Sequence, residues 1–157
     1  MWERESGHFA LGAFEAERGG VIADAQIGWE RHGTLNAARD NLVVYPSSYS
    51  AQHADMAWLI GPDKILDPTR WCILAIDMFS NGVSSGAAET PDYPALVTMG
   101  DNVRAQHRLV TERFGVDRVA AVYGRCLSGG ERTTGLAQVQ GSEKEFAQAI
   151  RERCKGL

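Results

Sequence analysis

The sequence is poor in the features that mark several classes of protein. It has only three cysteines, Cys72, Cys126 and Cys154, an odd number at wide spacings. This pattern fits neither a disulfide framework nor a zinc motif. No apolar run approaches the roughly 20 residues that span a bilayer. Basic residues are scattered, without the runs typical of nucleic-acid binders. We therefore expect no metal site, no membrane segment and no nucleic-acid partner.

The N-terminus also lacks the pattern of a secretory leader. Residues 1–5 are mostly charged and no apolar region follows them, so we expect a cytoplasmic protein. The chain has 157 residues, 44% hydrophobic and 23% charged, with a net charge of -4. These values are ordinary for one globular domain that is large enough to bury a core.

A β-hairpin is predicted near the N-terminus. Residues 21–30 mostly alternate between apolar and polar or small side chains, with Ile22 as the one residue out of phase. A period of two is typical of a half-buried strand. Residues 9–14 are a plausible antiparallel partner, reached through a turn at Gly19 and Gly20.

Three later runs are apolar without alternation. They cover residues 42–45, 72–76 and 119–123. Continuous apolar runs of this length fit strands that are buried on both faces, as in a parallel sheet.

A helix is predicted before the last of these runs. Thr98 and Asp101 have the spacing of a capping box, and Gly115 is a suitable helix end. The buried stripe of this helix should contain Val103, Gln106, Val110 and Phe114. Helix, glycine turn and buried strand together form half of a βαβ unit, which favours an α/β sheet.

Two other segments are less regular. Residues 81–94, rich in Gly, Ser and Pro, follow a predicted strand at the carboxyl edge of the sheet, where α/β proteins bind ligands. An ordinary surface loop explains them equally well. Residues 124–141 are polar and rich in glycine without a strong period, and residues 142–154 predict a short amphipathic helix.

Seven short strings, in order along residues 8–125, resemble the homoserine O-acetyltransferase-like branch of the α/β-hydrolase superfamily. They are residues 33–36 (GTLN), 40–41 (DN), 58–62 (WLIGP), 66–71 (LDPTRW), 77–82 (DMFSNG), 91–94 (PDYP) and 101–106 (DNVRAQ). The resemblance implies a partial α/β-hydrolase fold: an N-terminal hairpin plus parallel strands with flanking helices, truncated after the nucleophile-elbow strand. It implies one incomplete domain over residues 1–157, in which residues 126–157 form a divergent C-terminal tail.

The resemblance also implies acyl transfer or hydrolysis through a nucleophile, an acid and a histidine. No resident cofactor is expected; acyl-coenzyme A is a possible co-substrate, and the partners would be a small acyl donor and acceptor. Residues 49–53 look more like relatives whose substrate is not established. The acyl donor and acceptor of this chain therefore stay open.

The nucleophile should lie on a sharp turn after residues 119–123, flanked by small residues. In the family register, Gly124 is the first small residue and Cys126 is the nucleophile, where the family has serine. In the shifted register, Cys126 is the first small residue and Ser128 is the nucleophile. The family register fits the alignment better. A third interpretation is a glycine-rich loop in which neither residue is catalytic.

The histidines argue against a complete catalytic triad. All four precede the turn, whereas the fold orders its triad as nucleophile, acid and histidine. His53 is the best upstream substitute as a base for Cys126, although a solvent-exposed loop histidine is the simpler interpretation. It lies in the loop that, by resemblance, supplies an oxyanion-hole amide near Ser48.

We therefore expect a relative of homoserine O-acetyltransferase that is inactive or impaired as this chain. A truncation or a frameshift would explain the loss of the family pattern after Arg125. A non-catalytic binding or interaction protein on the same half-fold is the alternative, and an exposed sheet edge would then favour self-association. A cysteine-dependent esterase acting through Cys126 is a third hypothesis.

Overall fold

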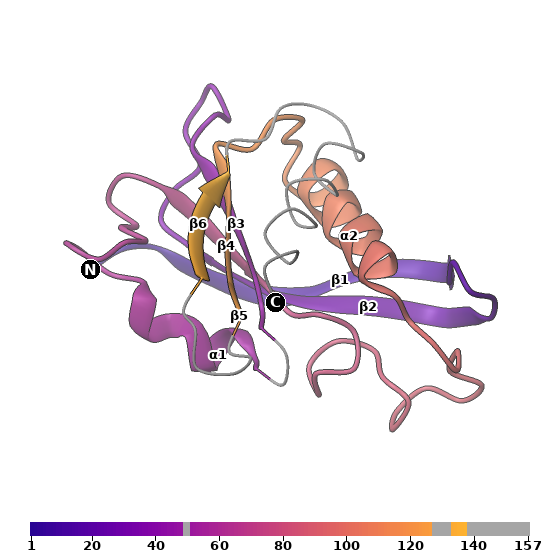
Figure 1. Cartoon of the computed structure of the whole chain (residues 1–157). Helices are drawn as coiled ribbons and strands as arrows, with labels where there is room; N and C mark the ends of the chain where they lie inside the picture. Colours follow the sequence, from indigo (N-terminus) through magenta and orange to yellow (C-terminus); the bar gives the residue numbers. More distant parts are fainter. Residues whose placement is uncertain (49–50, 127–132, 138–157) are drawn as a thin grey trace.

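The computed structural model describes residues 1–48, 51–126 and 133–137, with the backbone alone from residue 125 onward. One six-stranded sheet, in the order β1-β2-β4-β3-β5-β6, forms the centre of this part (Figure 1). The strands are β1 (Arg4–Glu15), β2 (Val21–His32), β3 (Leu42–Pro46), β4 (Cys72–Ile76), β5 (Ala121–Cys126) and β6 (Thr133–Ala137). The helices are α1 (His53–Met56), η1 (Ala57–Leu59), α2 (Met99–Arg108) and η2 (Leu109–Arg113).

The predicted hairpin is confirmed, with one change of phase. β1 and β2 pair antiparallel, Phe9 opposite Ile27, and form the long ribbon that crosses Figure 1. The pairing register shifts on both sides of the Gly12–Ala25 pair. Beyond this irregularity Ile22 is fully buried, whereas Val21 is 46% exposed. Ile22, which was out of phase with the predicted alternation, therefore belongs to the core, because a register shift exchanges the two faces of a strand.

The three apolar runs form the buried centre of the sheet. β3 pairs parallel with both β4 and β5, as predicted for strands that are covered on both sides. β4 coincides with its predicted run, and all five of its residues are buried. β5 begins two residues later than predicted and continues to Cys126. β2 pairs antiparallel with β4, so the sheet is mixed.

The predicted helix and its two ends are also confirmed. The Thr98 hydroxyl accepts from the Asp101 N–H and the Asp101 carboxylate accepts from the Thr98 N–H, which completes the capping box. The predicted stripe is buried, Val103 and Val110 at 2% exposure each. The last turn is a π-helix, η2, before Gly115 ends it with a φ of +61°. Gly115 fits because glycine adopts the left-handed conformation without a steric penalty.

Two apolar clusters cover the two faces of the sheet. The larger cluster packs α2 residues such as Val103 and Ala105 against β2, β3 and β4. The smaller cluster packs Met56 of α1 and Tyr45 of β3 on the other face. Figure 1 shows α1 and α2 on different sides of the strands. None of the helices in the described part is long and apolar enough to cross a membrane.

The sequence did not predict β6. It pairs antiparallel with β5, with Cys126 opposite Thr133, in a segment whose polar, glycine-rich sequence shows no strand period. The helix expected within residues 142–154 lies outside the described residues.

Candidate functional site

The end of β5 and the loop after β3 are neighbours because the two strands are parallel. Val44 pairs with Val122, so Pro46, the last residue of β3, is level with Gly124. The loop continues through Ser47 and Ser48, where the resemblance predicts an oxyanion-hole amide. In the described part of the chain, the N–H of Ser48 meets no acceptor. This region therefore contains a peptide donor near the end of the predicted nucleophile strand.

Of the two nucleophile candidates, Cys126 lies in the described backbone and Ser128 does not. Cys126 is the last residue of β5, three residues beyond the strand end predicted at Tyr123. Ser128 lies outside the described residues, as does the side chain of Cys126. The choice between the two registers, and the role of either residue as a nucleophile, stays a prediction.

His53 begins α1 and is bound to a carboxylate that follows β4. Its Nδ1 lies 2.5 Å from Asp77 Oδ2, and its peptide N–H donates to Asp77 Oδ1 at 2.9 Å. Asn81 Nδ2 donates to the same Oδ1 at 2.7 Å. Asp77 is fully buried, and the side chain of His53 is 21% exposed. An ionised carboxylate only accepts hydrogen bonds, so Nδ1 of His53 carries a proton.

The other nitrogen of His53 faces β2. His53 Nε2 lies 4.0 Å from Glu30 Oε2. In the strand order, β2 flanks β4 on the side opposite to β3 and β5. The described contacts of His53 therefore lead toward β2 and not toward the end of β5. Its role as a base for Cys126 stays a prediction, because the cysteine side chain is not described.

Glu30 connects the partly exposed His53 with the buried His32. Glu30 Oε1 accepts from Arg4 Nη2 at 2.5 Å, and Oε2 lies 3.3 Å from His32 Nε2. Burial would raise the pKa of Glu30, but the hydrogen bond from Arg4 and the nearby His32 outweigh it and hold the pKa below its usual range. Burial lowers the pKa of His32, and the neighbouring Glu30 offsets only part of this effect.

Sequence reasoning missed Asp77, Asn81 and Glu30 as members of this cluster. Asp77 directly follows a run of five apolar residues, so it lies at the carboxyl end of a buried strand. That position was the available signal for Asp77 and for the nearby Asn81. No comparable signal marked Glu30, because charged residues on a hairpin strand usually face solvent.

The described residues contain no group of three or more His, Cys, Asp or Glu side chains that could hold a metal ion. Cys72, the cysteine in β4, is buried without a disulfide, and burial raises its pKa to about 11. A thiol with this pKa is a poor nucleophile at neutral pH.

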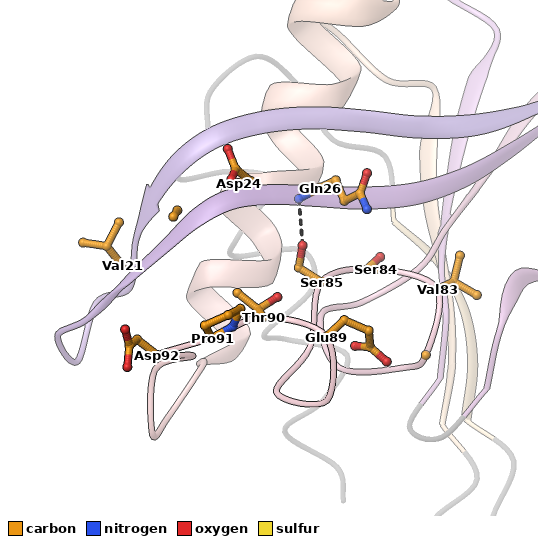
Figure 2. A pocket seen from close by; sticks show the side chains of 12 residues that line it. Val21, Asp24, Gln26, Val83, Ser84, Ser85, Glu89, Thr90, Pro91 and Asp92 are labelled. Carbon is orange, nitrogen blue, oxygen red and sulfur yellow. Dashed lines mark hydrogen bonds between the residues drawn. The ribbon is translucent and has the colours of Figure 1, made fainter.

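A cavity lies beside β2, lined in part by the loop of residues 81–94. It has a volume of about 590 Å³ and is lined by residues that include Asp24, Gln26, Ser85, Glu89 and Asp92 (Figure 2). Ser85 Oγ accepts from the N–H of Gln26, which ties the loop to the strand. The predicted ligand loop thus borders a hollow, but Ser48 and His53 do not line it. The candidate site lies instead at the ends of β3, β4 and β5, which carry Ser48, His53, Asp77 and Cys126.

No protein-family model matches the chain. It is 37% identical over 125 residues to a probable esterase from Corynebacterium glutamicum, and this match covers 73% of this chain and 35% of the esterase. It is 36% identical over 132 residues to an ethyl acetate hydrolase from Pseudomonas veronii, and this match covers 78% of this chain and 38% of the hydrolase. It is 30% identical over 129 residues to a homoserine O-acetyltransferase from Chlorobium chlorochromatii, and this match covers 74% of this chain and 36% of the acetyltransferase.

Solved structures agree with these relatives. The acetyl esterase MekB superposes with a TM-score of 0.72 at 32% identity, over 76% of this chain and 36% of that one. The chain therefore spans little more than a third of the proteins it resembles. Its fold is a partial α/β-hydrolase fold, as the resemblance predicted.

Proposed function

Because the homologues of this chain are esterases and homoserine O-acyltransferases, we propose that it carries the oxyanion loop and the nucleophile strand of an acyl-transfer site. The observation that carries this proposal is the parallel pairing of β3 with β5, which brings the loop of Ser48 beside the strand that ends at Cys126. An oxyanion hole requires peptide N–H groups that are held ready for the charge that develops on a carbonyl oxygen.

The proposed reaction begins with attack on an ester or thioester carbonyl. The sulfur of Cys126, or the oxygen of Ser128, forms a bond to the acyl carbon while the bond from that carbon to the donor's oxygen or sulfur breaks. The alcohol or thiol of the donor leaves with the proton of the attacking group. Water or the hydroxyl of an acceptor then takes the acyl group, the bond between the nucleophile and the acyl carbon breaks, and the nucleophile regains its proton. The names of two relatives, ethyl acetate hydrolase and acetyl esterase, support a short acyl group. Acyl-coenzyme A stays a proposed donor.

We further propose that the second step is impaired in this chain. No histidine follows Cys126 within the 157 residues. General-base help is worth on the order of 10²–10⁴-fold in such reactions. Both steps lack this help, but an activated ester such as p-nitrophenyl acetate can still acylate the nucleophile, whereas water should release the acyl group only slowly, so that the chain reacts once and does not turn over.

The test is acetylation of the 157-residue chain by p-nitrophenyl acetate, followed by intact-mass and peptide mass spectrometry. We expect at most one acetyl group per chain, at Cys126 or Ser128, with a burst of p-nitrophenol and no sustained release. The variants Cys126→Ala and Ser128→Ala identify the acceptor. Sustained turnover that disappears in Cys126→Ser would overturn the proposed impairment and support a cysteine-dependent esterase.

A chain in which neither residue is acetylated would favour the alternative of a non-catalytic interaction protein. One observation points to this alternative: Trp58 and Ile65 are 55% and 50% exposed, and the Ile60–Leu66 bridge brings their segments together. Exposed apolar side chains that cluster often mark association sites. Size-exclusion chromatography of wild type and Trp58→Ser would then show an oligomer that the variant disrupts.

A further inference from the structure

The loop after β3 is fixed at its beginning by the residues that follow β4. The peptide N–H of Ser47 donates to the carbonyl of Ile76 at 2.8 Å, and Ser47 Oγ accepts from the N–H of Met78 at 3.1 Å. Ser47 is buried. The residue directly before Ser48 is therefore held on both its main chain and its side chain.

The same segment after β4 holds the loop further along. Asn81 Nδ2 donates to the carbonyl of Ala51 at 3.1 Å, and Gln52 Nε2 donates to the carbonyl of Asn81 at 3.0 Å. The N–H and the imidazole of His53 both bind Asp77. Residues 77–81 thus contact the loop on both sides of Ser48.

Asp77 is the centre of these contacts, and its chemistry is specific. Three donors converge on its two oxygens: the N–H of His53, Nδ1 of His53 and Nδ2 of Asn81. A carboxylate accepts all three, whereas the amide of asparagine would turn an NH₂ group toward at least one donor. A buried carboxylate is costly unless its oxygens are hydrogen-bonded. In the described part of the chain no Lys or Arg side chain forms an ion pair with Asp77.

We propose that Asp77 is a positioning residue, which holds residues 47–48 and 51–53 so that the N–H of Ser48 is ready to stabilise an oxyanion. This inference rests on the proposed acyl-transfer function. The carboxylate does not touch the reacting atoms and acts through His53 and Asn81. A displacement of about 1 Å at a catalytic donor can reduce the rate about 10²-fold. Loss of this clamp, the contacts of Asp77 with His53 and Asn81, should therefore have a measurable effect.

The primary test compares Asp77→Asn with Asp67→Asn in the full chain. Asp67 is a matched control, since its Oδ1 accepts from Thr69 N and Thr69 Oγ1 in a surface turn. Asp77→Asn should slow the single acetylation by p-nitrophenyl acetate about 10²-fold. Asp67→Asn should leave it within about twofold. Amide hydrogen exchange should accelerate at His53 only in the first variant.

His53→Ala provides a second variant in case Asp77→Asn does not fold. It removes the imidazole and keeps the peptide N–H on Asp77, so it should slow acetylation less than Asp77→Asn. A positioning role predicts a uniform slowing at every pH. A role of His53 as the base predicts instead that the pH profile changes, and this result would overturn the positioning role.

A spectroscopic signal reports the clamp without any activity. The short Nδ1–H···Asp77 hydrogen bond should give a downfield proton resonance that is absent in Asp77→Asn and His53→Ala and present in Asp67→Asn. If the wild-type chain is never acetylated, the proposed function fails while this signal still reports the clamp. If Asp77→Asn retains the signal, the His53 protection and the wild-type acetylation rate, Asp77 has no positioning role.

Discussion

The indole N–H of Trp2 donates to Nδ1 of His32 across 3.1 Å and joins the N-terminus to the end of β2. An indole nitrogen can only donate, so Nδ1 of His32 must be an acceptor. The neutral imidazole therefore carries its proton on Nε2, which faces Glu30 Oε2 at 3.3 Å. His32 is 2% exposed, and in the described part of the chain its Nε2 has no hydrogen-bond partner, so the ring depends on the bond from Trp2.

Replacement of Trp2 by phenylalanine should destabilise the protein. Trp2→Phe keeps an aromatic ring but leaves Nδ1 of His32 as a buried acceptor without its donor. Such a loss costs about 1–3 kcal/mol of unfolding free energy. Urea unfolding followed by far-UV circular dichroism measures the change. Trp58→Phe is the control, since Trp58 is 55% exposed and surface substitutions usually stay within about 0.5 kcal/mol. Equal effects of the two variants would contradict the assigned role of Trp2.

Stability should fall as the pH is lowered from 7 toward 5. The pKa of His32 is below its usual value in the folded protein because the side chain is buried. The unfolded chain then binds the proton first as the pH falls through about 6.5, which favours unfolding. The pKa of Glu30 is also held down, so its contribution is lost at still lower pH.

The variant His32→Gln tests this pH dependence. It should flatten the dependence of the unfolding free energy between pH 7 and 5, whatever its effect on stability at pH 7. His8→Gln is the control, because His8 lies on the exposed part of β1 and its replacement leaves the buried His32 and Glu30 in place. An unchanged slope in His32→Gln would show that another group titrates in this range.

The sequence predicted the elements of the fold better than their exact register. The apolar runs of β3 and β4 and the capping box at Thr98 are local signals, and each appears where it was predicted. The burial of Ile22 depends on a register shift against β1, which no pattern within β2 alone contains. β6 lacks any strand period, and it was missed for that reason.

The candidate site was less accessible to sequence reasoning. His53 and Ser48 were selected through the resemblance. The parallel pairing of β3 and β5 places the loop of Ser48 beside the end of β5. The partners of His53 come from two other strands, Asp77 after β4 and Glu30 in β2. Contacts between residues so far apart in sequence follow from the strand order, which the apolar runs do not specify.

The turn after β2 should not tolerate a side chain at Gly33. Its φ of +80° is left-handed, and a Cβ would lie 2.5 Å from the carbonyl oxygen of Pro68 and also contact that of Trp71. Gly33→Ala should cost about 1–2 kcal/mol of strain and a further 1–3 kcal/mol, roughly, of overpacking. Gly12→Ala is a matched control, with φ +67° and no atom within 4 Å of a Cβ. It should show the strain alone in urea unfolding; equal losses would contradict the predicted clash.

Cys72 should resist alkylation as long as the sheet is folded. Its thiol is fully buried in β4, and its pKa of about 11 leaves roughly a thousandth of it as thiolate at pH 8. A short pulse of iodoacetamide followed by peptide mass spectrometry should leave Cys72 unmodified in buffer. In urea its pKa should return to about 8.5 and the same pulse should modify it. Modification at equal rates under both conditions would mean that β4 opens to solvent in the native chain, and the buried centre of the sheet described above would then be wrong.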